Sequence, residues 1–326
     1  MEDVRRDMFA EEGARARRAL VREIEARGDL RDPAWRAAFA EVPRHLFVPS
    51  YYVSGPAGYE RLWSGDPDPA RRARWLRGAY QDGALATRVR DGELLSSASQ
   101  PSLMARMLEA LDIGAGHDVL EIGAGSGYGA ALLCHRLGDR HVTTVDLDEE
   151  IAESARAHLA AAGHRPAVLT GDGARGCPEH APYDRIVATC EIPAVPCPWL
   201  AQCRPGARIL APLSTGLILL AVRDPEHAEG RFLDTSAYFV PLRGGGAARP
   251  PRRRAGGVPR RVYEDEGFQF LAGLAGERLD MGEALSLWQR ERQPERERFG
   301  VTVREGRQWA WLDDPEGPYA WPLPDL

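Results

Sequence analysis

The run VLEIGAGSGYGAALL, which begins at Val119, joins an apolar segment to a helix-forming segment through closely spaced glycines. Gly123, Gly125 and Gly127 carry no side chain, so the backbone can approach a ligand closely there. The N–H groups at the start of the following helix would point at that ligand. This pattern of strand, turn and helix predicts a cofactor-binding turn at residues 123–127.

Two acidic residues stand where the next two predicted strands end. Asp146 closes HVTTVD, 23 residues after Gly123, where a carboxylate can bind two ribose hydroxyls. Asp172 follows PAVLTG, where it could accept a hydrogen bond from an adenine amino group, although an Asp-Gly pair also forms ordinary turns. The glycine turn and both acids together favour a nucleoside-containing cofactor more strongly than any one of them alone.

A nicotinamide oxidoreductase competes with a methyltransferase at this point, because Gly125 to Ala130 satisfies the G-x-G-x-x-A pattern of dinucleotide-binding enzymes. Two features disfavour it: Gly123 follows the strand directly, and Glu121 stands two residues earlier. A methyl donor with a sulfonium and an amino group needs such a carboxylate to organise the loop. A peptide-binding module without activity is a third possibility, disfavoured because the glycines and both acids are intact.

Serines crowd the start of a predicted helix ahead of the glycine turn. In LLSSASQPSLMARMLEAL, residues 94–111, apolar residues recur at i, i+3 and i+4 from Leu103 onward. Pro101 suits the first helical position, where its missing N–H costs nothing. Such an N-terminus attracts anions, and the residues expected to lie there are Ser96, Ser97, Ser99 and Gln100.

The elements that position these residues alternate along the chain. From about residue 101 to 240, short apolar strands alternate with helices, which predicts an α/β fold with a mostly parallel, doubly wound sheet. Two helices are expected before residue 48, and residues 50–95 are expected to be loop-rich with one short arginine-rich helix. The predicted regions are N-terminal helices with a substrate-side loop region (1–95), the core (96–243), an Arg/Pro/Gly-rich linker (244–261) and a C-terminal extension with a helix and a hairpin (262–326).

Composition limits the classes of function. With 326 residues, 44% of them hydrophobic and 28% charged, the chain suits a soluble globular protein. No apolar run approaches the roughly 20 residues that a membrane span needs, and the charged N-terminus lacks a signal-peptide core, so we expect a cytoplasmic protein without a membrane partner. The net charge of −6 argues against a nucleic-acid partner. The five cysteines form no CxxC pair and the histidines show no ligand spacing, so no metal is expected.

Several segments between about residues 30 and 243 occur in the order of a known family: VPRHLFVP, SASQPSLMARMLEAL, VLEIGAGSGYGAALL, VTTVD, GDGARGCPEHAPYDRIVATC, IPAVPCPWLAQCRPGARILAPL and AYFVPL. In these segments the chain resembles the protein-L-isoaspartate O-methyltransferase family of Rossmann-like enzymes. The resemblance implies S-adenosyl-L-methionine as cofactor and S-adenosyl-L-homocysteine as product. The residues that it implies around the methyl donor are Ser99, Gln100, Glu121, Gly123, Ala124, Gly125, Ser126, Gly127, Asp146, Leu147, Gly171, Asp172 and Gly173.

The resemblance also implies that Ser97 and Ser99 are the catalytic residues, between the donor and the substrate carboxylate. A carboxylate is already ionised at neutral pH, so no base has to remove a proton. The two hydroxyls would orient the acceptor and would not act as nucleophiles. The rate enhancement would come from in-line alignment of oxygen, methyl and sulfur and from exclusion of water.

Three features depart from the repair enzymes of this family. Leu94 to Ser99 replaces their Gly-Gln-Thr-Ile-Ser lead-in, the segment before it is longer, and a tail follows the methyltransferase core. These features resemble relatives that methylate an aspartate of a macrocyclic, ribosomally made peptide precursor, whose ester closes to an aspartimide or becomes isoaspartate. We therefore expect a monomeric carboxyl O-methyltransferase of such a peptide. The alternative is a repair enzyme for L-isoaspartyl residues of damaged proteins.

Overall fold

The computed structural model describes residues 2–55, 58–90, 92–244 and 258–324 of the chain. Two compact units make up the chain, Met1–Gly171 and Asp172–Leu326. The boundary between them therefore lies inside the region predicted as one core, residues 96–243. No helix in the described ranges is long and apolar enough to cross a membrane.

Two helices open the first unit, as predicted for the segment before residue 48: α1 (Glu2–Ala26) and α2 (Pro33–Glu41). Asp32 caps α2 with its side chain, and Pro33 occupies the first helical position. Trp35 is buried, and the Arg136 guanidinium carbon lies 4.5 Å from its ring centroid. Arg136 belongs to α5 (Tyr128–Leu137), so α2 is packed onto the helix that follows the glycine turn.

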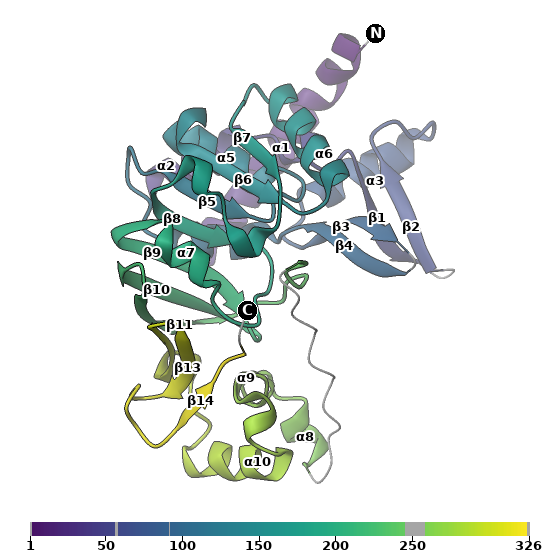
Figure 1. Ribbon diagram of the computed structural model, residues 1–326. Coiled ribbons are helices and arrows are strands. Elements are labelled where there is room, and N and C mark those ends of the chain that lie inside the picture. Colours follow the sequence, from purple (N-terminus) through teal and green to yellow (C-terminus); the bar gives the residue numbers. More distant parts are fainter. Residues whose placement is uncertain (1, 56–57, 91, 245–257, 325–326) are drawn as a thin grey trace. The chain divides into compact units, whose positions relative to one another are not determined.

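A four-stranded antiparallel sheet follows, in the order β2-β1-β3-β4. Its strands are β1 (Ser50–Gly55), β2 (Gly58–Trp63), β3 (Leu85–Arg90) and β4 (Glu93–Ala98), and helix α3 (Pro69–Ala79) lies beside it (Figure 1). The expectation of a loop-rich segment at 50–95 was wrong, apart from the arginine-rich helix, which is α3. Each strand has only six residues and exposes a polar face, so the segment contains no long apolar run.

The rest of the first unit has the predicted alternation of strands and helices. The parallel strands lie in the order β5-β6-β7, and their ranges are Val119–Ile122, Val142–Asp146 and Ala167–Thr170. The helices around them are α4 (Pro101–Ala110), α5 and α6 (Glu149–Ala161). All four residues of β5 and all five of β6 are buried, as expected for parallel strands covered on both faces.

The second unit is a sheet in the order β14-β13-β12-β11-β10-β9-β8. The strands are β8 (Tyr183–Ala188), β9 (Cys203–Leu213), β10 (Gly216–Asp224), β11 (His227–Ser236), β12 (Phe299–Arg304), β13 (Arg307–Leu312) and β14 (Ala320–Pro322). Among the named strands of this unit, β8 and β9 pair in parallel and the later pairs are antiparallel. Short turns join β9 to β10, β10 to β11 and β12 to β13, whereas a long segment that contains α8, α9 and α10 separates β11 from β12. The sheet structure is therefore mixed, where the alternation predicted a mostly parallel one.

The C-terminal extension continues this sheet. Strand β12 pairs with β11, with Val303 opposite Ala228, and the predicted hairpin and helix are confirmed as β12–β13 and α10 (Met281–Arg290). Other helices of the unit are α7 (Cys197–Ala201), α8 (Arg260–Tyr263) and α9 (Glu266–Leu274) (Figure 1). Of the predicted linker 244–261, residues 245–257 lie outside the described residues.

Short 3₁₀ turns complete the assignment, at Arg44–Leu46, Asp139–His141, Gly173–Arg175, Pro178–His180, Gly276–Arg278 and Arg296–Arg298.

Candidate active site

The glycine turn has the backbone conformation that its sequence predicts. Gly123, Gly125 and Gly127 have φ angles of 94°, 52° and 86°, a region that side chains disfavour. The backbone N–H groups of Gly123 and Ala124 donate to the carbonyl oxygen of Val145, at 2.8 and 3.2 Å, which ties the turn to β6. Helix α5 begins directly after Gly127, so its first N–H groups face the turn.

Glu121 lies beneath this turn, with 1% of its surface exposed. Thr144, its partner across β5 and β6, donates a hydrogen bond to Glu121 Oε2 at 2.7 Å. Burial raises the pKa of Glu121 to about 8; the nearby Asp146 raises the pKa too, and the Thr144 bond opposes both. A Cβ atom on Gly129 would collide with Glu121 Oε1, so Gly129 makes room for the carboxyl group. Sequence reasoning did not select Gly129.

Asp146 connects the turn to the next helix. Its Oδ2 accepts a hydrogen bond from the Gly125 N–H at 3.1 Å, and its Oδ1 accepts one from the Asp148 N–H at 3.2 Å. The next residue, Leu147, exposes 40% of its surface, which is unusual for a large apolar side chain. The Asp146 carboxylate can accept hydrogen bonds from ribose hydroxyls, and the exposed Leu147 side chain beside it can pack against an adenine ring. The pair therefore suits the nucleoside part of S-adenosyl-L-methionine. The Gly171 N–H donates to the Asp146 carbonyl oxygen at 2.9 Å.

The serines are placed differently from the prediction. Ser96 and Ser97 belong to strand β4, which ends at Ala98, and only Ser99 and Gln100 adjoin helix α4. The Ser97 carbonyl oxygen and Ser96 Oγ would lie 3.6 and 3.8 Å from a Cβ atom on Gly125, so the end of β4 lies against the glycine turn. Ser96, which was not chosen as a site residue, is thus the serine whose hydroxyl faces the turn. Strand alternation was the signal that could have revealed this.

The N-terminus of α4 already holds a carboxylate of the chain itself. Asp82 accepts hydrogen bonds from the Ser102 N–H at 2.9 Å and from Gln100 Nε2 at 3.2 Å. It also pairs with Arg27 at 2.6 Å, and only 2% of its side chain is exposed. The expectation that this helix end would hold the substrate anion is therefore corrected, because Asp82 occupies that role. The sequence does not identify Asp82, which is 20 residues away from the N–H that it binds.

Arg44 is a second residue that sequence reasoning missed. Its side chain is completely buried, and its guanidinium donates to four carbonyl oxygens, those of Ala79, Gln81, Gly83 and Ser99, at 2.8–3.1 Å. Burial lowers the pKa of Arg44, although neighbouring groups that include Asp82 raise it. The residue fixes both the segment that carries Asp82 and the backbone of Ser99. An arginine inside the apolar segment VPRHLFVP was the available signal, since a buried charge requires several partners.

The predicted residues Asp172 and Gly173 begin the second unit. Asp172 Oδ1 accepts a hydrogen bond from the Ala174 N–H at 3.0 Å and so caps the 3₁₀ turn that follows. A Cβ atom on Gly244 would lie 2.6 Å from the same oxygen. Trp199 Nε1 donates to the Gly173 carbonyl oxygen at 2.8 Å. The Ala174 contact is that of an ordinary Asp-Gly turn, and the adenine contact of Asp172 stays a prediction.

One group of side chains in the described ranges has metal-ligand spacing. Cys134, Asp139 and His164 place their ligand atoms within 4.8 Å of one another. His164 Nδ1 and Asp139 Oδ1 are 3.1 Å apart, and the Arg165 N–H donates to Asp139 Oδ2 at 2.6 Å. Burial, with a further contribution from Asp139, raises the pKa of the Cys134 thiol. The carboxylate of Asp139 is therefore already bonded to His164 and to the backbone of Arg165. The expectation that the protein binds no metal stays a prediction.

Comparison with known proteins agrees with the geometry of the turn. The family model of protein-L-isoaspartate(D-aspartate) O-methyltransferase matches residues 71–245. A protein-L-isoaspartate O-methyltransferase of Hyperthermus butylicus is 34% identical over 244 residues, which cover 70% of this chain and 89% of that protein. One of Aeropyrum pernix is 34% identical and covers 70% of this chain and 80% of that protein. The match favours the methyltransferase interpretation over the nicotinamide one.

Solved structures show the same fold. A protein-L-isoaspartate O-methyltransferase with 20% identity superposes with a TM-score of 0.61 and covers 95% of this chain and 100% of its own. A Plasmodium falciparum protein of the same description, solved with S-adenosyl-L-homocysteine, gives a TM-score of 0.53 at 13% identity over 69% of this chain and 97% of its own. Because of the family match and the relatives aligned over most of their length, the chain belongs to the protein-L-isoaspartate O-methyltransferase family, whose members are S-adenosyl-L-methionine-dependent protein carboxyl O-methyltransferases.

Proposed function

We propose that the protein methylates the free carboxylate of L-isoaspartyl residues in proteins or peptides. The observation that carries this proposal is the contact between strand β4 and the glycine turn, with the Ser97 carbonyl oxygen and Ser96 Oγ both beside Gly125. This contact brings a strand with adjacent hydroxyl groups to the turn where a methyl donor would bind. Family membership supplies the reaction type, methyl transfer to a carboxyl oxygen.

The residues of the first unit suit S-adenosyl-L-methionine, which supplies an electrophilic methyl group on a sulfonium. Gly123 to Gly127 leave room for close approach of the donor, and Asp146 with Leu147 suits its ribose and adenine. The donor contacts predicted from the sequence for Ser99, Gln100, Ser126 and Gly171 stay predictions, as do those predicted for Asp172 and Gly173 of the second unit. Glu121 supports the turn from below, because its carboxyl group is buried and bonded to Thr144.

The acceptor needs orientation more than it needs activation. Its carboxylate is ionised at neutral pH, so a general base has no proton to remove. Ser97 would donate a hydrogen bond that holds one carboxylate oxygen in line with the methyl group, and Ser99 would assist from a backbone that Arg44 holds in place. The ester formed can then lose methanol when the next backbone nitrogen attacks it, which closes a succinimide.

Methylation of an aspartate in a cyclised ribosomal peptide is the second candidate. The sequence favoured it because of the tail, the longer segment before β4 and the altered lead-in Leu94 to Ser99. The tail no longer distinguishes the two candidates, since a solved isoaspartate methyltransferase covers 95% of this chain. The lead-in is the feature that still favours peptide tailoring. The predicted cytoplasmic location, monomeric state and absence of a nucleic-acid partner remain predictions.

A direct test uses two linear peptides that differ only in having isoaspartate or aspartate at one position. Donor binding is first confirmed by the thermal shift with S-adenosyl-L-homocysteine. Mass spectrometry then follows a gain of one methyl group over time. Methylation of the isoaspartyl peptide alone would support the proposal, whereas inactivity on both peptides despite donor binding would favour a dedicated cyclic precursor.

A further inference from the structure

We propose that the open face of the four-stranded sheet binds the substrate segment beside the acceptor residue, and that Arg61 selects an acidic side chain there. This inference rests on the proposed function and names a feature of the substrate. We call this surface the open face; it consists of the side chains of Tyr52, Tyr59, Arg61, Trp63, Ala86 and Ser97.

The strand register places Arg61 and Ser97 on the same face. Arg61 of β2 lies opposite Tyr52 of β1, Tyr52 lies opposite Ala86 of β3, and Ala86 lies opposite Ser97 of β4. Directly opposite residues of antiparallel strands project their side chains to the same side. A continuous row of side chains therefore runs from Arg61 across the sheet to the predicted catalytic Ser97.

The other face of the sheet is covered. Tyr51, Leu62, Leu85 and Ala98, which alternate with the open-face residues, are each at most 7% exposed. The Tyr51 hydroxyl donates to the Trp75 carbonyl oxygen of α3 at 2.8 Å. Because α3 packs on this side, an approaching peptide can use only the open face.

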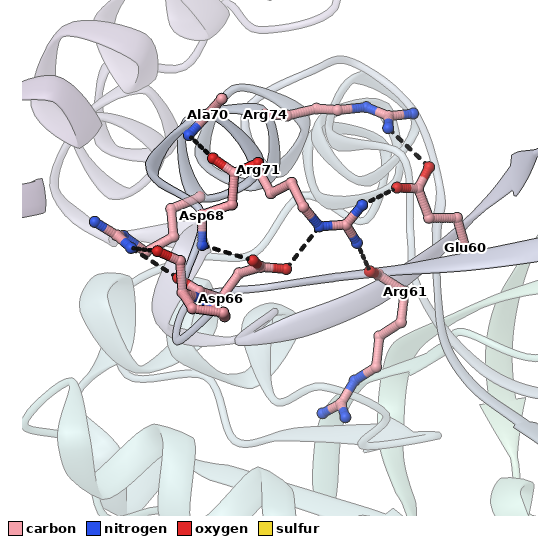
Figure 2. A network of polar contacts seen from close by, with 9 residues as sticks. Glu60, Arg61, Asp66, Asp68, Ala70, Arg71 and Arg74 are labelled. Carbon is pink, nitrogen blue, oxygen red and sulfur yellow. Dashed lines mark hydrogen bonds and ion pairs between the residues drawn. The ribbon is translucent and has the colours of Figure 1, made fainter.

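A network of ion pairs holds β2 against α3 and leaves Arg61 outside it (Figure 2). Arg71 binds Asp66 at 2.8 Å, and Arg71 and Arg74 each bind one oxygen of Glu60. Arg71 Nη2 also donates to the Arg61 carbonyl oxygen at 3.0 Å, while Figure 2 shows the Arg61 side chain pointing away from the network. Both oxygens of Glu60, the nearest acid in sequence, are therefore already used.

The Arg61 guanidinium is available for a carboxylate. The structure gives it no ion pair within the described ranges, and its one ring contact is with Trp63, at 5.7 Å from Cζ to the centroid. Trp63 and Tyr59 on the same strand are 37% and 63% exposed. An arginine between two exposed aromatic rings suits a peptide segment with a carboxylate, because the guanidinium can bind it through two hydrogen bonds and the rings can pack on its aliphatic parts.

The width of the sheet sets the spacing in the substrate. Arg61 and Ser97 are separated by three strand-to-strand steps of about 4.8 Å, or about 14 Å in all. An extended peptide advances about 3.4 Å per residue. The acidic side chain is therefore expected about four residues from the acceptor.

The test compares isoaspartyl peptides that carry either Glu or Gln four residues before, or four residues after, the acceptor. For one of the two placements, we expect the wild-type KM to be about three- to fivefold lower with Glu, as for a solvent-exposed ion pair, with kcat unchanged. Arg61→Gln should remove this preference. Arg77→Gln is the matched control, because Arg77 is an exposed residue of α3, on the covered side, and the preference should survive there.

Three other outcomes would overturn the inference or separate it from the proposed function. Equal KM values for Glu and Gln peptides on the wild type would exclude acid selection and leave the methyltransferase function intact. If no isoaspartyl peptide is methylated although the donor binds, the proposed function fails, and fluorescence anisotropy with labelled Glu and Gln peptides on wild type and Arg61→Gln then decides about the open face. A dimer in sedimentation that Trp63→Ala dissociates would assign the face to a second copy of the chain.

Discussion

Glu121 is a carboxyl group in the interior of the first unit with Thr144 as its hydrogen-bond donor. Its pKa of about 8 is well above the unfolded value of 4.5. Between these values the folded state binds more protons than the unfolded state, so the free energy of unfolding falls as pH rises from about 4.5 to 8. The full stabilisation from the protonated form is present only below the unfolded pKa.

Glu121→Gln should therefore remove a pH-dependent penalty. The neutral amide can accept the Thr144 bond, and at pH 8 we expect the variant to be more stable than the wild type by up to about 4 kcal/mol. Urea denaturation of both proteins at several pH values between 5 and 8 measures this. If the free energies of unfolding of the two proteins differ by the same amount at every pH in that range, Glu121 does not titrate there.

Ser96 and Ser97 are neighbours in β4 and project to opposite faces, so their substitution should have different effects. Ser97→Ala should lower kcat/KM for an isoaspartyl peptide about tenfold, as for loss of a hydrogen bond to a charged group, without a change in donor affinity. Ser96→Ala should weaken donor binding instead, because Ser96 Oγ faces Gly125. Steady-state kinetics and donor titration separate the two effects, with Ser286→Ala on α10 as an exposed control. An unchanged kcat/KM in Ser97→Ala would contradict an orienting role.

At the scale of single residues, the spacing of the glycines correctly predicted the turn at 123–127, and the hydrogen bond from the Gly125 N–H to Asp146 agrees with it. The prediction failed for partners distant in sequence. Gly129 is needed because of Glu121, and that contact depends on how α5 packs on β5. Local pattern carries no information on such packing.

Arg44 helps to hold the segment that carries Asp82, in addition to the bonds that Asp82 itself makes to Arg27 and to the start of α4. Its four carbonyl partners include three in the segment 79–83 and one at Ser99. Arg44→Met would remove these four hydrogen bonds from buried and partly buried oxygens, of which that of Gln81 keeps the Gly83 N–H as a donor. We expect a cost of about 3–5 kcal/mol in the free energy of unfolding. Thermal and urea unfolding measure this, and Arg44→Lys should recover part of the loss because an ammonium can reach some of the oxygens. Unaltered stability in Arg44→Met would show that water replaces the guanidinium.

The segment 50–95 illustrates why elements can be missed. The sequence has Gly, Pro and Asp clusters there, which predicted loops, and those of them that the structure describes lie at or between the ends of β1–β4 and α3. Short strands with one exposed face leave only two or three apolar residues each, too few for a periodic signal. The helices were easier, since α2 and α3 each begin with an Asp cap followed by Pro.

At the scale of the whole molecule, the tail was expected to be a region of its own after a linker. The aromatic residues Trp311 and Trp321 are buried within it. Pairing of β12 with β11, however, makes it part of the sheet of the second unit. Strand pairing between residues about 70 positions apart has no local signature, so the sequence could not predict it.

Phe270 shows how strongly the tail and the sheet depend on each other. The ring is 1% exposed and lies 4.8 Å from the Phe232 ring of β11 and 5.2 Å from the Phe299 ring of β12, measured between centroids. Phe270→Ala should lower the free energy of unfolding by about 3–5 kcal/mol, because it leaves a cavity between tail and strands. Tyr238→Ala, at a residue that is 60% exposed, should change it by less than about 0.5 kcal/mol.

Truncation after residue 243 tests the same dependence more severely. It removes the ladder partner of β11 and exposes Phe232, so we expect loss of the cooperative unfolding transition and aggregation of the fragment. Calorimetry of the fragment beside the full chain measures this. A fragment that unfolds cooperatively at the temperature of the full chain, and methylates the same peptides, would instead make the tail a separate accessory. In that case Phe270→Ala tells whether the tail has a weak interface with β11 or none. A tail without an interface predicts that Phe270→Ala does not change the unfolding transition of the rest of the chain.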